Sequence, residues 1–91
     1  MLSNAQFTKD PDATLDYEVD WTDWLNGDTI TASAFTVPTG ITLATQLHTD
    51  SKAVVWLSGG TVGSKYDVVN RITTAGGRTD DRTIRIVIQQ K

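Results

Sequence analysis

The sequence has 91 residues, no cysteine and a single histidine, His48. Without cysteine, neither a disulfide framework nor a cysteine-based zinc site can form, so the fold must be held together by packing. A metal site with two histidine ligands from one chain is excluded as well. His48 follows an expected strand and lies at a turn, where we expect its side chain to be exposed.

Basic clusters and long apolar runs are also missing. The eight Lys and Arg residues are scattered and the formal net charge is -3, so we expect no nucleic-acid partner, because phosphate binding needs clustered positive charge. No stretch approaches the roughly 18 apolar residues of a membrane span, and residues 1–7 lack the basic and apolar regions of a secretion signal. We therefore expect no membrane partner, and a protein that is soluble or is carried outside as part of an assembled particle.

Motifs for catalysis are absent too. The segment Gly59-Gly60-Thr61-Val62-Gly63 has neither the Lys nor the following helix of a phosphate-binding loop. Asp80 and Asp81 are neighbours, and neighbouring side chains on a strand point to opposite faces, so we interpret them as a polar flank of the hairpin and not as an acid pair. The acidic residues of the first third fit no calcium loop and indicate a solvated acidic face. They are Asp10, Asp12, Asp16, Glu18, Asp20, Asp23 and Asp28. We expect no enzyme activity, no cofactor and no metal site.

The pattern that the sequence does contain is period-two alternation of apolar and polar side chains. Residues 66–74 alternate, a glycine turn follows at residues 75–77, and Ile84, Ile86 and Ile88 continue the pattern, which is typical of a closing β-hairpin. Further strands are expected at residues 15–21, 28–37, 41–47 and 52–58. Short strands at a spacing of about ten residues predict an all-β fold, an immunoglobulin-like or fibronectin III-like β-sandwich of six to seven antiparallel strands.

Three of these segments carry more specific expectations. Within residues 28–37, Ile30, Ala32 and Ala34 are expected to share one face, with Phe35 on the other. Residues 22–27 predict a single helical turn or a wide loop, capped by Thr22. Residues 52–58 are apolar on both faces, which suits a strand that is covered on both sides or that makes an outside contact.

A glycine-rich corner precedes the strand that opens at Tyr66. Gly60 and Gly63 lie within it. In immunoglobulin-like sandwiches a Tyr at this place bonds with its hydroxyl to the upstream backbone. We therefore expect a structural corner formed by Gly60, Gly63 and Tyr66, with the hydroxyl bonded to backbone between Leu57 and Gly63.

The chain divides into an arm, residues 1–13, and an immunoglobulin-like sandwich domain, residues 14–91, because no strand pattern begins before Thr14. The expected subunit contacts are Phe7 as the anchor of the arm, the loop with Trp21, Trp24 and Leu25, and the strand around Trp56. Two alternatives remain for the Trp residues. Each can fill the core or its rim, or an exposed Trp24 or Trp56 can serve as a stacking platform for a sugar.

Several segments together resemble one family. They are Lys9-Asp10-Pro11-Asp12-Ala13-Thr14-Leu15-Asp16-Tyr17-Glu18-Val19-Asp20-Trp21, Trp24-Leu25, Gly27-Asp28-Thr29-Ile30, Leu57-Ser58-Gly59-Gly60-Thr61, Tyr66 and Asn70-Arg71-Ile72-Thr73-Thr74. From Lys9 to Val87 the chain resembles small virion proteins of tailed bacteriophages, and it is most similar to phage fibre-tail adaptor proteins. The distinctive part is Asp-Pro-Asp followed by Leu-Asp-Tyr and a Trp pair.

The resemblance implies a non-enzymatic β-sandwich of the virion, made in the host cytoplasm, that joins a tail fibre or spike to the baseplate or tail. Its partners would be other virion proteins, namely tail fibre, spike, baseplate or tail tube proteins, with several copies in the particle. Two alternatives are a head decoration protein, since those are also small sandwiches, and a carbohydrate-binding sandwich module.

Overall fold

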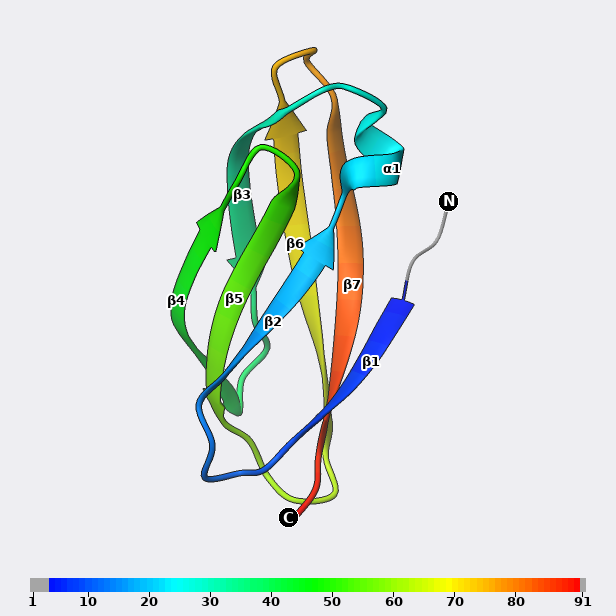
Figure 1. Ribbon diagram of the computed structural model, residues 1–91. Coiled ribbons are helices and arrows are strands. Elements are labelled where there is room, and N and C mark those ends of the chain that lie inside the picture. The colour runs from blue at the N-terminus through cyan, green and yellow to red at the C-terminus, as the bar shows by residue number, and fades with distance from the viewer. Residues whose placement is uncertain (1–3, 91) are drawn as a thin grey trace.

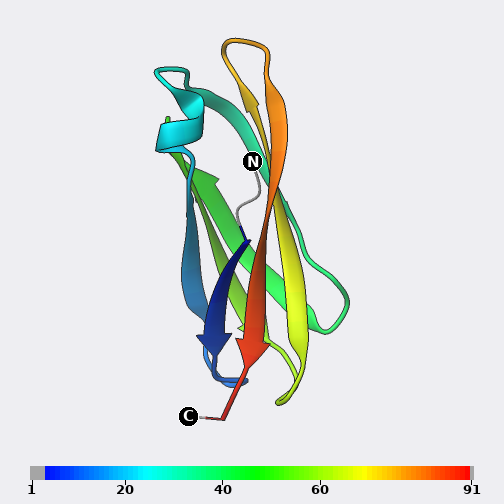
Figure 2. The same cartoon turned by 90° about the vertical axis from the view of Figure 1, so that its right-hand side faces the viewer.

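The computed structural model describes residues 4–90, which form β-strands and one short helix (Figure 1). The elements are β1 (Asn4–Lys9), β2 (Leu15–Asp20), α1 (Thr22–Leu25), β3 (Ile30–Thr36), β4 (Ile41–His48), β5 (Lys52–Gly59), β6 (Lys65–Thr74) and β7 (Thr79–Ile88). The strands pack as two layers, with β2 in one and β6 and β7 in the other (Figure 2). The all-β sandwich expected from the sequence is confirmed.

The strand order is that of an immunoglobulin-like sandwich. One sheet has the order β1-β7-β6-β3 and the other β2-β5-β4. Immunoglobulin domains likewise place their second, fifth and fourth strands in one sheet and their third, sixth and seventh in the other. The six strands expected from the sequence pair antiparallel, and β1, which was expected to be part of an arm, runs parallel to β7.

The core lies between the two sheets and follows the alternation of the sequence most closely in the last third of the chain. On β6 and β7 every second side chain is buried, as expected. These side chains are Tyr66, Val68, Asn70, Ile72, Ile84, Ile86 and Ile88. Facing them, β5 buries Ala53, Val55 and Leu57.

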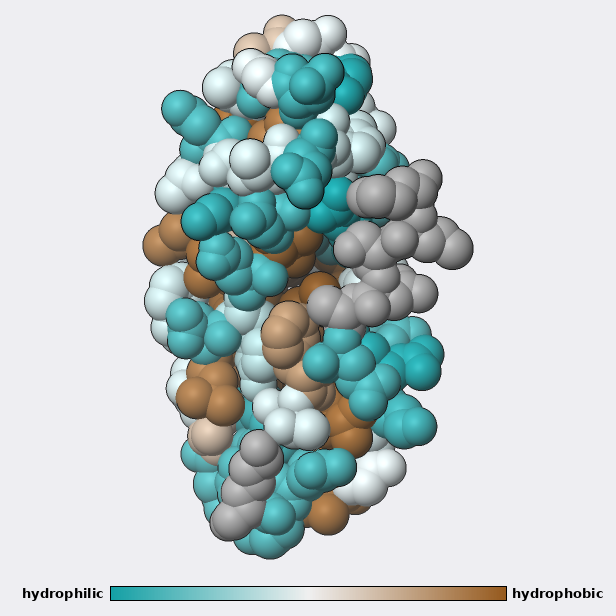
Figure 3. All heavy atoms as spheres, turned by 45° about the vertical axis from the view of Figure 1, so that its right-hand side comes forward, coloured by the Kyte–Doolittle hydropathy of each residue, from teal (hydrophilic) through white to brown (hydrophobic). Residues whose placement is uncertain are grey.

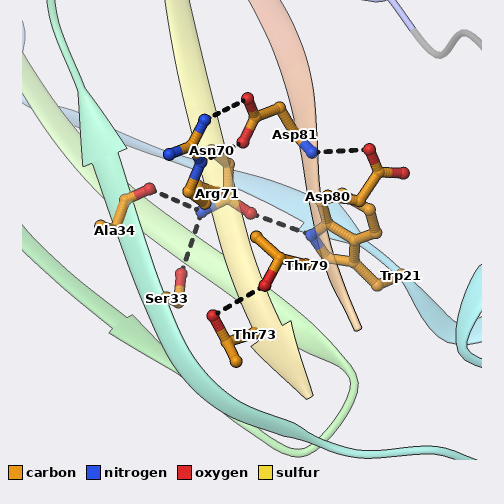
Figure 4. Close-up of polar contacts among 9 residues, drawn as sticks. All are labelled: Trp21, Ser33, Ala34, Asn70, Arg71, Thr73, Thr79, Asp80 and Asp81. Atoms are coloured by element: carbon orange, nitrogen blue, oxygen red, sulfur yellow. Dashed lines mark hydrogen bonds and ion pairs between the residues drawn. The ribbon is translucent and has the colours of Figure 1, made fainter. Parts of the chain in front are cut away.

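One polar cluster lies inside this core. The indole Nε1 of Trp21 donates to Oδ1 of Asn70 at 2.9 Å, and Nδ2 of Asn70 donates to Oγ of Ser33 at 2.9 Å and to the carbonyl of Ala34 at 3.2 Å (Figure 4). Trp21 and Asn70 are both 0% exposed. The amide therefore links the residue that follows β2 to both β6 and β3, with all its polar atoms satisfied.

A β-bulge changes which residues of β3 face the core. The pairing of β3 with β6 slips between Ile30 and Ala32. Ile30 and Phe35 are therefore both buried, whereas Ala32 and Ala34 are exposed. The expectation that both Ala residues share the face of Ile30 is wrong, because one extra residue in a strand reverses the inside and outside positions that follow it.

A second bulge has the same effect on β4. Its pairing with β5 slips between Leu43 and Thr45. Beyond the slip, Leu47 points outward and is 48% exposed. Gln46 lies opposite an inward position of β5, and its Oε1 accepts the backbone N–H of Phe35 in β3 at 3.0 Å. The side chain of Gln46 thus bridges the adjacent edges of the two sheets.

The expected N-terminal arm is largely a strand of the sandwich. β1 pairs with β7 along its whole length, from Asn4 opposite Thr83 to Lys9 opposite Ile88. The boundary expected between residues 13 and 14 is therefore wrong for residues 4–9, while residues 1–3 lie outside the described part. Residues 4–9 are mostly polar and show no strand pattern, because a strand at a sheet edge requires backbone pairing more than it requires apolar side chains.

Lys9 at the end of β1 is 0% exposed. Its Nζ donates to the carbonyl of Gly59 at 2.8 Å and to that of Asp10 at 2.9 Å. Burial lowers the pKa of Lys9, and the charges of Asp10 and Asp12 oppose this shift. The buried ammonium group therefore fastens the end of β1 to the end of β5.

The corner before β6 has the geometry expected from the sequence. The backbone N–H of Thr61 donates to the Tyr66 hydroxyl at 3.1 Å. Gly60 adopts φ +101°, and a Cβ there would lie 2.6 Å from Cδ1 of Ile88, so only glycine fits. Gly63 also has a positive φ, +85°. The hydroxyl of Tyr66 thus closes the corner from within the core.

The single helical turn expected at residues 22–27 is present as α1, but Thr22 is not its cap. Trp21 occupies the N-cap position and makes no side-chain cap bond. Instead Oδ1 of Asp20 accepts the backbone N–H of Thr22 at 2.9 Å and its hydroxyl at 2.5 Å. Both bonds favour the ionised carboxylate and lower the pKa of Asp20.

Asp28 holds the β6–β7 turn against the segment between α1 and β3. Its Oδ1 accepts the N–H of Thr29 at 2.8 Å and that of Gly76 at 3.0 Å, and its Oδ2 accepts Nε of Arg78 at 3.2 Å. The hydrogen bond from Thr74 is the largest cause, and together these donors lower the pKa of Asp28 to about 2. This carboxylate is thus ionised wherever the protein is folded above that pH.

We expect the buried pair Trp21–Asn70 to be strongly coupled. Asn70→Leu should lower the free energy of unfolding by about 1–3 kcal/mol, because the indole N–H is then buried without a partner. Trp21→Phe leaves Oδ1 of Asn70 buried without its hydrogen-bond donor in the same way. The double variant removes both polar partners, so it should cost less than the sum of the two single variants. Urea unfolding of all four proteins measures the coupling, and strictly additive costs would contradict it.

We also expect Asp28 to contribute to acid sensitivity. Its folded pKa of about 2 lies below the ordinary 3.8, so its stabilising effect is complete above pH 3.8 and is lost as the pH falls towards 2. Asp28→Asn should therefore lower the melting temperature at neutral pH, and its difference from the wild type should shrink between pH 4 and pH 2. A difference that stays constant over this range would contradict the role of the carboxylate.

Candidate functional site

The residues expected at subunit contacts divide into buried and accessible ones. Trp21 is 0% and Leu25 is 2% exposed. Neither side chain leaves surface for another protein, so both expectations are corrected: these two residues fill the core at the end of the sandwich where α1 lies. The alternative of core packing holds for them.

Trp24 is half-buried and is covered by a cation. Its ring packs edge-on against Trp21, with centroids 5.3 Å apart, and the guanidinium carbon of Arg78 lies 4.2 Å from the ring centroid. Arg78 also donates to the carbonyls of Trp24 at 3.3 Å and Leu25 at 2.8 Å. Arg78 thus satisfies the carbonyls at the end of α1 and shields the ring that was expected to contact a partner.

A second cation supports the same end. The guanidinium carbon of Arg82 lies 4.2 Å from the centroid of the Trp21 ring, and its Nη1 donates to the carbonyl of Asp20 at 2.7 Å. Arg78 and Arg82 carry no local sequence signal, because their partners lie 50 or more residues away. Asn70 carried a signal, since it is a polar residue at an inward position of an alternating strand.

Phe7 anchors β1 within its own chain. It is half-buried, and its ring centroid lies 5.1 Å from that of Tyr17 on β2. The hydroxyl of Tyr17 donates to the carbonyl of Thr8 at 3.2 Å. These contacts join the edge of one sheet to the edge of the other. Phe7 therefore packs against the core of its own chain.

Trp56 lies on the outer face of the β2-β5-β4 sheet. On β5 its neighbours Val55 and Leu57 point into the core, whereas Trp56 points outward and is half-buried. In the sheet it stands between Asp16 of β2 and Thr45 of β4. Among the residues expected at contacts, Trp56 is the one that the fold directs onto an outer sheet face.

Two further apolar residues extend this surface. Val54 lies two positions from Trp56 on the same side of β5, and Leu47 stands opposite Val54 on β4. Leu47 is 48% exposed. We call Leu47, Val54 and Trp56 the Trp56 stripe.

A row of acidic side chains borders the Trp56 stripe. Asp16, Glu18 and Asp20 all point outward from β2, and Lys52 of β5 is the basic residue opposite Asp20. Lys52 lies 3.7 Å from Glu18, an exposed ion pair that contributes little stability. We call the three carboxylates the acidic row, and its net charge remains negative. In the space-filling view, apolar residues on the side of β1 and β2 form patches interrupted by hydrophilic ones (Figure 3).

The outer face of the other sheet differs, because its charges are matched in pairs across β6 and β7. Arg71 lies 2.7 Å from Asp81, and Arg85 lies 2.9 Å from Asp67. Hydrogen bonds from the arginines lower the pKa of Asp81 and of Asp67. Asp81 is thus held by Arg71, while Oδ1 of Asp80 accepts the N–H of Asp81 at 2.8 Å (Figure 4). The two carboxylates are not arranged as an acid pair.

Within residues 4–90, no group of three or more His, Cys, Asp or Glu side chains could hold a metal ion. In the same part of the chain, no helix has the length and apolar character that crossing a membrane requires.

Comparison with known proteins identifies the family. The family described as podophage GP4 fiber-tail adaptor protein gp77 matches residues 9–87. A search among curated proteins found no match. The matched residues include the acidic row, the Trp56 stripe, α1, the corner at Tyr66 and nearly all of β7. The chain therefore belongs to the podophage GP4 fiber-tail adaptor family.

Proposed function

We propose that the protein is a non-enzymatic joint of the phage tail that holds a tail fibre or spike on the tail or baseplate. Membership of a fibre-tail adaptor family supports a structural protein of the virion tail. The observation that carries the choice of contact surface is the position of Trp56 on an outer sheet face. The joint is made through the Trp56 stripe and the acidic row beside it.

Burial separates this surface from the other candidates. Trp21 and Leu25 are enclosed by their own chain, Arg78 covers Trp24, and Phe7 packs on Tyr17. Trp56 points to the outer face of the sheet and lies on its middle strand. Aromatic residues at the centre of an interface commonly supply most of its binding energy.

The charges next to the stripe define the partner. Asp16, Glu18 and Asp20 face one side of the stripe, and Lys52 neutralises only part of their charge. A complementary partner presents an apolar socket for Trp56 with Lys or Arg at its rim. Such charges speed the encounter and exclude wrong partners more than they add affinity.

The two alternatives are less well supported. A sugar-binding groove would use a pair of exposed Trp rings, but Trp21 is buried and Trp24 is stacked under Arg78. A head decoration protein could have the same sandwich, but the family match points to the tail.

We expect Trp56→Thr to uncouple the joint without unfolding the domain. Thr suits an outward strand position, and it already stands opposite Trp56 at Thr45. Loss of a central aromatic anchor commonly costs 2 kcal/mol or more, which is about a 30-fold loss of affinity. The measurement is complementation of a phage that lacks the gene: particles with the variant should carry few fibres in electron micrographs and give a reduced plaque titre.

Val69→Thr is the matched control. Val69 is also half-buried and points outward, but from β6 on the opposite sheet, where Thr36 and Thr83 flank it. This variant should give particles with the wild-type number of fibres. The melting temperatures of both variants must stay close to that of the wild type. Normal fibre content with Trp56→Thr would refute the contact surface, and a sugar bound by the wild type but not by Trp56→Thr would favour the carbohydrate alternative.

A further inference from the structure

One long stretch of the chain has no formal charge. Residues 29–49 contain no Asp, Glu, Lys or Arg, although such residues make up 21% of the sequence. Asp28 and Asp50 mark its two ends. The stretch comprises β3, the connection to β4, and β4 itself. The absence of charge is therefore concentrated in two strands.

These two strands are the edges of the sandwich on one side. β3 ends the sheet β1-β7-β6-β3, and β4 ends the sheet β2-β5-β4 (Figure 1). Strands at an edge present unpaired backbone N–H and C=O groups, and natural proteins usually protect them with charged residues, proline or a β-bulge; of these, β4 has the bulge at Ala44. The opposite edge of the second sheet, β2, has that protection in the acidic row. β4 has neither a charged residue nor a proline.

β4 is the more accessible of the two edges. Residues 42 and 44–48 are exposed, which is most of the strand. On β3, by contrast, the side chain of Gln46 reaches over and accepts the N–H of Phe35. An incoming strand therefore meets β4 first.

We propose that β4 pairs with β4 of a second copy of this chain, antiparallel and across a two-fold axis, so that two three-stranded sheets join into one sheet of six. A two-fold axis brings an edge against itself, so an edge that carries charges of one sign places them opposite charges of the same sign. The acidic β2 edge cannot pair in this way, because three carboxylates would face their own copies. The uncharged β4 edge carries no such penalty, which favours a second copy of the chain over a charged partner.

The bulge in β4 is compatible with this pairing. An axis between Ala44 and Thr45 places Thr42 opposite Leu47 of the second copy. Both residues point outward, because the bulge at Ala44 shifts the alternation by one residue. The same axis places Leu43 opposite Gln46 of the second copy, and both lie on the core side. Outward side chains thus meet outward ones along the whole strand.

The pairing adds to the proposed joint and does not depend on it. The outer face that carries Trp56 continues across the new sheet, so the dimer presents two Trp56 stripes on one surface. Two copies of a weak site on one rigid body bind a symmetric partner more tightly than one copy does.

The test is the mass of the protein in solution. Sedimentation equilibrium of the wild type should show a reversible dimer with twice the chain mass of 9.9 kDa. Thr45→Lys and Thr45→Glu each place like charges on both sides of the axis and should each weaken the dimer on the order of 100-fold. An equimolar mixture of the two variants should restore a dimer, because opposite charges then meet.

Thr8→Lys is the matched control, since Thr8 is an exposed residue of the edge strand β1, on the other sheet. It should dimerise as the wild type does, and so should Trp56→Thr, which separates this proposal from the joint. Thermal unfolding of each variant shows whether it is folded. A wild type that stays monomeric at its highest soluble concentration, or a folded Thr45→Lys that still dimerises, would overturn the proposal.

Discussion

The hydrogen bond from the Trp21 indole to the Asn70 amide is the interaction on which the rest of this end of the molecule depends. Both groups are buried away from water and would be costly without each other. The bond fixes where the chain leaves β2, and the same amide ties β6 to β3. Once Trp21 is placed, Arg82 can stack on its outer side and Trp24 can pack edge-on against it.

The sequence predicts the strands whose partners are close and whose alternation is unbroken. β6 and β7 are of this kind, and so is the corner at Tyr66. Prediction fails where the pairing decides the structure: β1 is polar and becomes a strand only because β7 offers it backbone partners. It also fails at the bulges of β3 and β4, since the extra residue, Thr31 in β3 and Ala44 in β4, depends on the neighbouring strand and leaves no mark in the local sequence.

In the candidate site, too, local alternation predicts some residues correctly, and distant parts of the chain decide the others. Trp56 was expected at a contact because its strand is apolar on both faces, and that inference uses only local alternation. Whether Trp21, Trp24 and Leu25 are surface or core depends instead on Arg78 and Asn70, which reach them from the far end of the chain. Family resemblance over residues 9–87 supplied what periodicity could not, namely membership of a phage fibre-tail adaptor family.

The parallel pairing of β1 with β7 has a mechanical consequence. Asn4 begins one strand and Ile88 ends the other, so these residues lie at opposite ends of the ladder that joins them. A pull that separates them acts along the strands and strains all hydrogen bonds of the ladder at once, instead of opening them one after another. The hydrogen bond from Lys9 to the carbonyl of Gly59 adds a link to β5 at the end of the ladder where Lys9 pairs with Ile88. Under tension, a domain built in this way resists by shear, which suits a component through which a force is transmitted.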